Sequence, residues 1–355
     1  MKQLYMLKTK RRGMFLVLLL MTTLPMVAQG AVEKFEAGGL VYKVLDATKQ
    51  TISVEPQTDF SKYDPAAGDN HPAYDNQLSA TLDFTKPVTY KNKKWTVTEI
   101  GERALQRVNI TEVILPEGIT KIGYKAFFKT KSLKIIKFPK SLKAIEQQAF
   151  YGSGLTEVNI PGATAIGNAA FLSCTDMTTL KIPNVTFLGT MCFRHCSQLK
   201  TVTVPVSANI GKSCDASLKD YKLLFNLFKD RNLKTYYENN SGNVAFGDCY
   251  NLTEAILQDG ITTVPEAMFS FCGDLKDITI PASVKSVQDD AFRCCFSLTS
   301  MNIPEVESIG NCAFLQCWNL RGDLILSNKV KEIKDFAFDH TGFSGIKWEG
   351  TDDAR

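Results

Sequence analysis

Histidine is scarce in this chain, which has three histidines among 355 residues, at His71, His195 and His340. The ten cysteines lie at regular intervals instead of in the close pairs that hold zinc, and the chain has no glycine-rich phosphate-binding loop. Without an acid, a base and a nucleophile that converge, the chain is expected not to be an enzyme. We predict no catalytic residue, no cofactor and no metal site.

Two patterns leave alternatives open. His195 lies beside Cys196, which would suit a cysteine nucleophile with its base, although neighbouring residues on a turn point apart. Acidic residues recur at five- and six-residue steps in one loop, at Asp59, Asp64, Asp69 and Asp75. They could attract calcium, although the spacing matches no calcium-loop template.

An excess of basic residues is also absent from most of the chain. The formal net charge of +4 comes from 41 basic and 37 acidic residues, but five of the basic ones lie in the first thirty residues, which contain no acidic residue. The remainder has 36 basic and 37 acidic residues, a net charge of −1. This balance provides no basic stripe, and we predict no nucleic-acid partner.

Long apolar runs are missing after the first thirty residues, so no later segment is expected to span a membrane. The first thirty residues begin with basic side chains, continue with apolar residues at 14–20 and 24–28, and end with small residues at Ala28 and Gly30. This order is typical of a secretory signal peptide, residues 1–30, cleaved after Gly30 or after Ala28. An uncleaved anchor is the alternative, but the apolar run is shorter than the roughly 20 residues that span a bilayer. Export would bring the protein to the cell surface, the medium or the periplasm.

The chain does contain a unit of about 22 residues that recurs from residue 100 onward. A phenylalanine column consists of Phe127, Phe150, Phe171, Phe193, Phe246, Phe269, Phe292, Phe314 and Phe338. An aliphatic column opens each unit at Ile100, Ile122, Ile145, Ile166, Leu188, Ile210, Val264, Val287, Ile309 and Ile333. A proline column follows at Pro116, Pro139, Pro161, Pro183, Pro205, Pro281 and Pro304. Recurrence at a nearly fixed period predicts a solenoid.

Each unit is too short to bury its own apolar residues, so neighbouring units must stack as rungs. The residues before each proline alternate between apolar and polar, as around Val158 and Ile160, which predicts a short strand with one buried face. Strands in adjacent rungs then lie roughly 4.8 Å apart, and the apolar columns become ladders along the axis. We predict about ten rungs of stacked short strands, joined by turns or short helical pieces.

Six of the ten cysteines each follow a column phenylalanine by three residues: Cys174, Cys196, Cys249, Cys272, Cys295 and Cys317. Thr130 and Ser153 fill the same position in earlier units. Replacement by small hydroxyl residues favours a buried ladder of free thiols, in which cysteine acts as a small hydrophobe with a weak donor. Disulfides between rungs are the alternative, because alpha carbons about 5 Å apart would permit them in an oxidising compartment.

Residues 31–97 lack the repeat and have strand patterns of their own, at 40–45, 51–55, 79–84, 88–90 and 94–98. The first two patterns are joined by a polar connection and predict a hairpin. We predict an N-terminal β cap over this segment, which protects the edge of the first rung, followed by repeat blocks at 98–205 and 244–355.

An irregular stretch at 206–243 separates the two blocks. The step from Phe193 to Phe246 is 53 residues, which exceeds two units by about nine and is expected to replace one rung. Apolar residues recur there at helical spacing, at Leu218, Tyr221, Leu224, Phe225 and Phe228. This predicts an amphipathic helix that covers the solenoid, or one that projects and contacts a ligand through Tyr236, Tyr237 and Glu238.

The solvent side of the repeated strands is the other candidate binding surface. Its side chains lie between the buried pairs and vary from rung to rung, at Lys137, Asn159, Lys181, Thr203, Thr279 and Asn302. An extended surface suits a protein or a glycan chain better than a small molecule, which needs a concave apolar pocket.

Three kinds of segment occur together: GLVYKVL at 39–45, YKNKKWTVTEIG at 90–101, and units such as IGNAAFLSC at 166–174. With them, about 320 residues resemble the BspA-like leucine-rich-repeat proteins of Bacteroidetes and related bacteria. The resemblance implies a leucine-rich-repeat solenoid, and a secreted or surface-attached, non-enzymatic protein of the adhesin type. Some relatives bind host matrix proteins such as fibronectin and fibrinogen, but the family shares no ligand site that would transfer a binding residue.

We therefore expect a non-catalytic protein that binds an extracellular protein or glycan. The alternative is a structural spacer, or a component of a surface layer or scaffold, that binds only copies of itself. The oligomeric state stays open.

Overall fold

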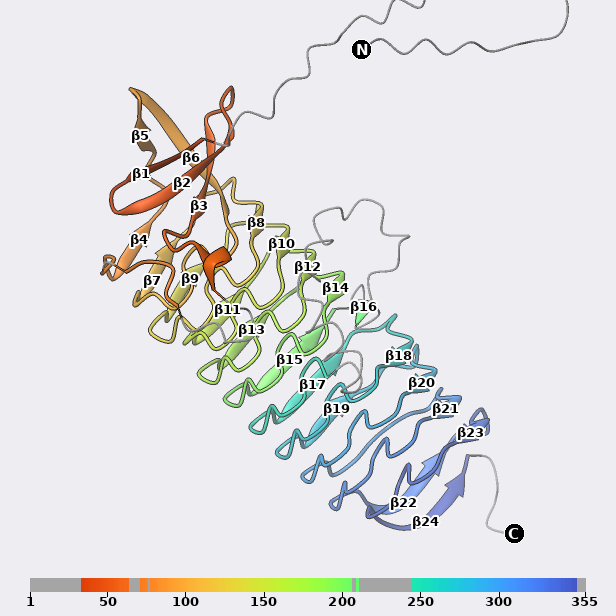
Figure 1. Cartoon of the computed structure of the whole chain (residues 1–355). Coiled ribbons are helices and arrows are strands. Elements are labelled where there is room, and N and C mark those ends of the chain that lie inside the picture. Colours follow the sequence, from red (N-terminus) through yellow and green to blue (C-terminus); the bar gives the residue numbers. More distant parts are fainter. Residues whose placement is uncertain (1–32, 64–70, 76, 206–208, 211–243, 350–355) are drawn as a thin grey trace, which may run out of the picture. The chain divides into compact units, whose positions relative to one another are not determined.

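Stacked rungs of short strands make up the body of the protein (Figure 1). The computed structural model describes residues 33–63, 71–75, 77–205, 209–210 and 244–349, and residues 33–355 form one unit. Apart from one 3-10 helix, η1 (Phe60–Lys62), the secondary structure of these described residues consists of strands and turns. The prediction of a solenoid of stacked short strands is confirmed.

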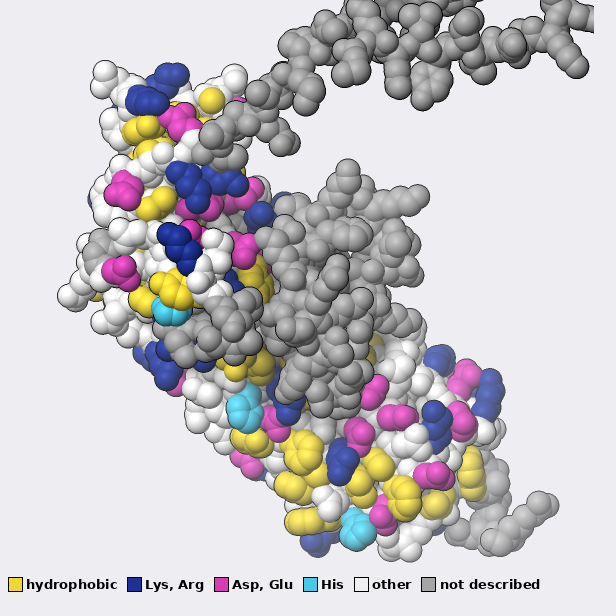
Figure 2. Space-filling model, viewed as in Figure 1, with side chains coloured by type: hydrophobic (Ala, Val, Ile, Leu, Met, Phe, Trp, Pro, Cys, Tyr) yellow, Lys and Arg dark blue, Asp and Glu magenta, His cyan; other side chains and the backbone are white. Residues whose placement is uncertain are grey.

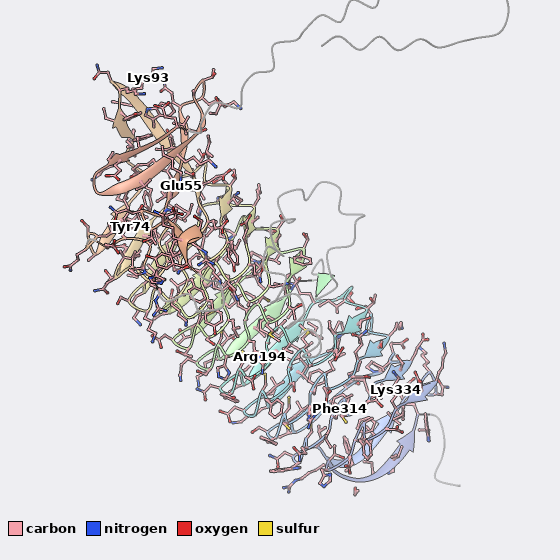
Figure 3. The ribbon with its side chains drawn as sticks, viewed as in Figure 1. Glu55, Tyr74, Lys93, Arg194, Phe314 and Lys334 are labelled. Carbon is pink, nitrogen blue, oxygen red and sulfur yellow. The ribbon has the colours of Figure 1, made fainter. Side chains whose placement is uncertain are left out.

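The N-terminal strands precede the repeats and form β1 (Lys34–Ala37), β2 (Leu40–Asp46), β3 (Thr51–Glu55), β5 (Val88–Tyr90) and β6 (Lys93–Ile100). β2 pairs antiparallel with β1 and with β3, where the sequence predicts a hairpin, and β3 pairs parallel with β6. The ring of Phe35 stacks on Tyr90 at 3.9 Å and lies 6.3 Å from Trp95. Tyr74 closes this region by donating its hydroxyl hydrogen bond to the carbonyl oxygen of Glu55 (Figure 3).

Two series of parallel strands run through the rungs. Series one consists of two-residue strands: β8 (Lys121–Ile122), β10 (Ala144–Ile145), β12 (Ala165–Ile166), β14 (Phe187–Leu188), β16 (Asn209–Ile210), β18 (Thr263–Val264), β20 (Ser286–Val287), β21 (Ser308–Ile309) and β23 (Glu332–Ile333). The second residue of each strand belongs to the aliphatic column. Because β6 pairs parallel with β8, the N-terminal strands continue directly into series one.

Series two consists of strands from the part of each unit in which the proline column lies. Its strands are β4 (Thr81–Asp83), β7 (Glu112–Ile114), β9 (Ile135–Lys137), β11 (Glu157–Asn159), β13 (Thr179–Lys181), β15 (Thr201–Val204), β17 (Glu254–Leu257), β19 (Asp277–Thr279), β22 (Arg321–Leu326) and β24 (Gly342–Trp348). The middle residue of a typical member is buried between two exposed neighbours, as Val158 is between Glu157 and Asn159. This alternation is what a strand with one buried face requires. β4 lies within residues 31–97 but pairs parallel with β7, so series two begins inside the segment predicted as the cap.

The phenylalanine column forms a continuous stack through the interior. Successive rings from Phe127 to Phe338 lie 4.9–5.8 Å apart between centroids, with interplanar angles of 4–13°. All but the last of these rings are fully buried. Burial of an aromatic ring with both faces covered is the largest single contribution that a repeated residue makes here.

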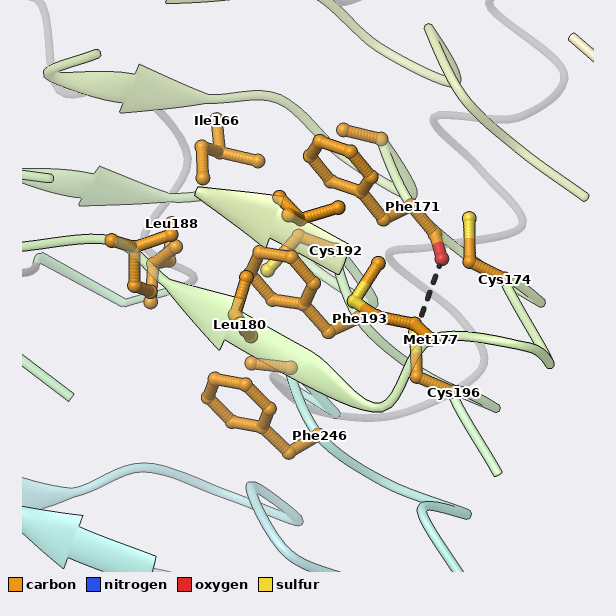
Figure 4. Close-up of a cluster of buried hydrophobic side chains, with 14 of the residues drawn as sticks. Ile166, Phe171, Cys174, Met177, Leu180, Leu188, Cys192, Phe193, Cys196 and Phe246 are labelled. Atoms are coloured by element: carbon orange, nitrogen blue, oxygen red, sulfur yellow. Dashed lines mark hydrogen bonds between the residues drawn. The ribbon is translucent and has the colours of Figure 1, made fainter. Parts of the chain in front are cut away.

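The six cysteines form a second buried ladder, the cysteine ladder, and they are free thiols. Each Sγ donates a hydrogen bond to the carbonyl oxygen of the column phenylalanine one rung earlier, at 3.1–3.4 Å. Figure 4 shows one such bond, from Cys196 to Phe171. The prediction of buried free thiols is confirmed for these six residues, and their hydrogen bonds also tie adjacent turns together with weak donors.

The sequence predicts that the irregular stretch replaces one normal rung between the two blocks. The ring of Phe193 stacks directly on Phe246 at 5.4 Å, and β15 pairs parallel with β17, so the two flanking rungs are neighbours. β16 pairs with β14 as an ordinary member of series one, so residues 209–210 belong to the repeat. The predicted helix at 218–228 lies outside the described residues.

Candidate binding surfaces

The outward side of series two carries the strand-face residues predicted from the sequence. Lys137, Asn159, Lys181, Thr203 and Thr279 are all exposed. The strand register places Asn159 opposite Lys181, and β17 lies between Thr203 and Thr279, pairing with both strands. We call this aligned column the strand face. Because each side chain projects from a paired strand whose other side is buried, the side chains of the strand face keep a fixed order from rung to rung.

The remaining predicted contact residues are not on this column of strands. Asn302 is exposed, but no strand is assigned to its segment. Tyr236 and Tyr237 lie outside the described residues.

The electrostatic character of the strand face is mixed. The neighbouring outward column contains two acids, Glu157 and Glu254. It also contains two hydroxyl residues, Thr179 and Thr201, and the exposed apolar residue Ile135. Lys134 forms an ion pair with Asp176, 2.5 Å apart, and this pair crosses two rungs. Alternating acids, amines and hydroxyls give no large field of one sign, so a partner would be recognised by matched local groups instead of by net charge.

The two residues of the nucleophile alternative do not meet. Cys196 is buried, and burial raises the pKa of its thiol well above its usual range, so it holds no reactive thiolate. His195 is nearly half exposed, and its Nδ1 lies 4.0 Å from Asp248 Oδ2. Arg194 donates to the same carboxylate at 2.6 Å, as a surface ion pair between adjacent rungs (Figure 3). The cluster is therefore a link between two turns.

The aspartates of the calcium alternative are partly accounted for by local turns. Asp59 caps η1 and accepts hydrogen bonds from the backbone N and the Oγ of Ser61, which lower the pKa of its carboxyl group. Asp64 and Asp69 lie outside the described residues. Within the described ranges, no three side chains of histidine, cysteine, aspartate or glutamate gather closely enough to hold a metal ion.

A second surface, absent from the sequence-based predictions, comes from the turns of the second block. Tyr250, Phe271 and Trp318 are 46%, 42% and 54% exposed, and the half-buried ring of Phe296 lies 4.9 Å from Trp318. Figure 2 shows hydrophobic side chains gathered over the C-terminal half of the face in view, among scattered charges. We call these four residues the aromatic stripe. Three of them follow a column phenylalanine by four residues, a column that alignment of the units would have revealed.

Comparison with known families identifies the repeat. Six copies of the repeat described as "BspA type Leucine rich repeat region" match residues 98–219 and 239–351, about two thirds of the chain. The chain belongs to this family. Membership in the BspA-type family confirms the resemblance found in the sequence and indicates a protein-binding repeat protein, of a kind that is typically non-catalytic.

One solved structure has the same fold, and two others are similar to this chain. The pneumococcal vaccine antigen PcpA has a TM-score of 0.51 and 18% identity, over 90% of this chain and 88% of its own. A leucine-rich repeat protein from Bacteroides ovatus has a TM-score of 0.36 and 20% sequence identity. The match covers 88% of this chain and 100% of that protein's chain. A leucine rich cell surface protein from Faecalibacterium prausnitzii has a TM-score of 0.35 and 19% sequence identity. The match covers 91% of this chain and 97% of that protein's chain. A comparison with curated proteins gives no match.

A transmembrane helix is not found in the part of the chain that the structure describes, where no helix reaches the necessary length and apolar character.

Proposed function

We propose that this BspA-type protein is exported and binds an extracellular macromolecule, without catalysis, through its strand face. The observation that supports this function is the contrast between the two sides of series two. The inward residues repeat and stack as ladders, whereas the outward residues are exposed, aligned and chemically different from rung to rung. Repeat solenoids use such extended surfaces to bind proteins.

Export rests on the first thirty residues, whose basic start, apolar run and small residues are those of a signal peptide. An adhesin-like role, with a host matrix protein or a glycan as partner, follows from the family resemblance. Both parts of the proposal can be separated experimentally, because export is read from the N-terminus of the mature protein and binding is read from the purified chain.

Surface-immobilised binding tests the function directly. The purified chain would be presented to fibronectin, fibrinogen, collagen, mucin and bacterial polysaccharides, beside a Lys137→Glu, Lys181→Glu variant of the strand face. A Lys93→Glu, Lys94→Glu variant is the matched control, because it makes the same charge change on exposed residues of β6. Saturable binding that is lost only in the strand-face variant is expected. Binding that both variants retain equally would place the contact elsewhere.

A structural spacer that assembles with copies of itself is the second candidate function. It is favoured by the exposed apolar side chains of the last described rung, where Phe336, Ile346 and Trp348 are 65%, 60% and 41% exposed. Ile346 pairs with the buried Leu324 of the preceding rung, so it occupies a core position that nothing in the described residues covers. Such an edge favours pairing with another chain. Concentration-dependent light scattering that falls in an Ile346→Ser variant would support assembly, and a monomer at all concentrations would exclude it.

A further inference from the structure

The aromatic stripe is a surface feature that neither the fold nor the strand face explains. Large aromatic side chains on consecutive turns expose apolar area to water, and a contiguous exposed apolar patch usually marks a contact site. The stripe does not arise from the interior, because the column phenylalanines and the cysteine ladder fill the core without it. Its residues are therefore available to a partner.

The spacing of the stripe follows the rungs. Tyr250, Phe271, Phe296 and Trp318 belong to the four successive rungs whose column phenylalanines stack 5.2–5.8 Å apart. Backbone hydrogen bonds connect the turns that carry them, from Asp274 N to the Tyr250 carbonyl at 3.1 Å. Tyr250, Phe296 and Trp318 each follow their column phenylalanine by four residues and Phe271 follows its own by two, so the exposed aromatic side chains are spread over four successive rungs along the solenoid.

A glycine keeps the row continuous. A Cβ at Gly273 would lie 3.5 Å from Cδ2 of Phe296, so the Phe296 ring extends over the turn of the preceding rung. On its other side the same ring contacts Trp318. The Phe296 ring therefore bridges two rungs.

The charges beside the stripe neutralise one another. Arg194 pairs with Asp248 at 2.6 Å, and Arg293 pairs with Asp290 at 3.3 Å. The hydroxyl of Tyr250 donates to Asp248 Oδ1 at 3.3 Å. The surroundings thus offer hydrogen-bonding groups without a net field, which favours an uncharged, hydroxyl-rich partner over a strongly charged one.

We propose that the aromatic stripe binds an uncharged polysaccharide chain that lies along the solenoid axis, with sugar rings stacked on the aromatic faces. The C–H bonds on one face of a pyranose carry partial positive charge, which complements the negative face of an aromatic ring. A linear polymer that lies along the solenoid axis can contact the exposed aromatic side chains of successive rungs. The inference rests on the part of the proposed function that makes the protein a binder of extracellular macromolecules, and it adds a glycan site on the turns to the strand face.

Affinity gel electrophoresis of the full chain tests the proposal, with hydroxyethylcellulose, galactomannan, dextran and laminarin as the uncharged probes. A Phe296→Ala, Trp318→Ala variant removes two adjacent rings, and Trp318→Tyr retains a stacking ring. Tyr63→Ala is the matched control, because Tyr63 is 42% exposed but lies outside the stripe. Circular dichroism of each variant establishes that it is folded.

Saturable retardation by at least one probe is expected, weakened at least about tenfold in the double variant. Trp318→Tyr and Tyr63→Ala should bind nearly as the parent does, and added salt should have little effect because no charges are neutralised. The emission of Trp318 should shift to shorter wavelength when a sugar covers it, in a Trp348→Phe background that removes the other exposed tryptophan.

Other outcomes overturn the proposal. Absence of retardation by all four probes, or equal retardation of the parent and the double variant, would refute glycan binding at the stripe. Loss of fibronectin binding in the double variant would assign the stripe to a protein partner. If the parent binds a protein but no glycan, and the strand-face variant loses that binding, this inference is refuted and the proposed function stands. If the parent binds neither a protein nor a glycan, the inference and the proposed function are both refuted.

Discussion

Alkaline pH should destabilise the solenoid through the cysteine ladder. Burial raises the pKa of Cys174, Cys249 and Cys317 to about 12, and it raises the pKa of the other three ladder thiols well above the usual range. In the unfolded chain a thiol ionises with a pKa of about 8.5. The folded state therefore keeps a proton that the unfolded state releases. The stability is fully present below the unfolded pKa and is lost as the pH rises toward the folded pKa.

The expected effect is large because six thiols act together. Between about pH 7.5 and about pH 9.5, each ladder thiol should lower the free energy of unfolding by about 1.4 kcal/mol, and the six by about 8 kcal/mol. The result depends only on the unfolded pKa, since the folded thiols stay neutral over this interval. A loss of about 8 kcal/mol is comparable with the whole stability of many domains, about 5–15 kcal/mol.

Urea unfolding at the two pH values, followed by circular dichroism with a phosphine reductant present, measures this loss. A Cys272→Ser variant should lose about 1.4 kcal/mol less than the parent, because a serine hydroxyl does not ionise in this range. Ser153 already occupies the same position in another rung, so the substitution suits the site. Thr130→Ser is the control, since it changes the same ladder position without removing a thiol. An equal loss in Cys272→Ser and the parent would refute the assignment of the pH dependence to the ladder.

Two further predictions concern the interior and the turns. Phe171→Ala should lower the free energy of unfolding by about 3–5 kcal/mol, because its ring is fully buried and stacked on both faces, whereas Phe338→Ala should cost less, because its ring stacks on one column neighbour only. A larger loss in Phe338→Ala, measured by urea unfolding, would contradict the stack. Gly162→Ala should destabilise the fold by about 1–3 kcal/mol, because its Cβ would lie 2.1 Å from the carbonyl oxygen of Lys140, and Gly273→Ala should change it by less than about 0.5 kcal/mol. Equal thermal shifts for the two alanine variants would argue against the close approach of backbones at Gly162.

The left-handed turns show why some of the structure was not readable from the sequence. The residue two after each column phenylalanine has a positive φ, as in His195 (64°), Phe271 (62°) and Gln316 (63°). A conformation that recurs in residues so different is set by the stacking of turns and not by local preference. It also decides which side chains emerge from the turns, so the column that holds Tyr250, Phe296 and Trp318 can be read from the sequence but its exposure cannot.

The junction between the two repeat blocks shows the same limit. The step of 53 residues from Phe193 to Phe246 predicts one replaced rung, but sequence distance does not say whether the flanking rungs touch. The stacking of Phe193 on Phe246 shows that the flanking rungs are neighbours. A loop can lengthen at small entropic cost when the backbones on both sides of it still pair, so chain length does not reveal the number of rungs.

The sequence by itself determined the period, the inward columns and the outward strand residues, because burial in a repeated strand imposes an alternation that every unit must obey. Val158 and Asn159 could be assigned to opposite sides from this alternation alone. Only the tertiary structure decided that each ladder thiol bonds to the preceding rung, that the ring of Phe296 lies against Trp318 of the next rung, and that the last described rung leaves Ile346 uncovered. These features depend on contacts between units, which a pattern within one unit does not specify.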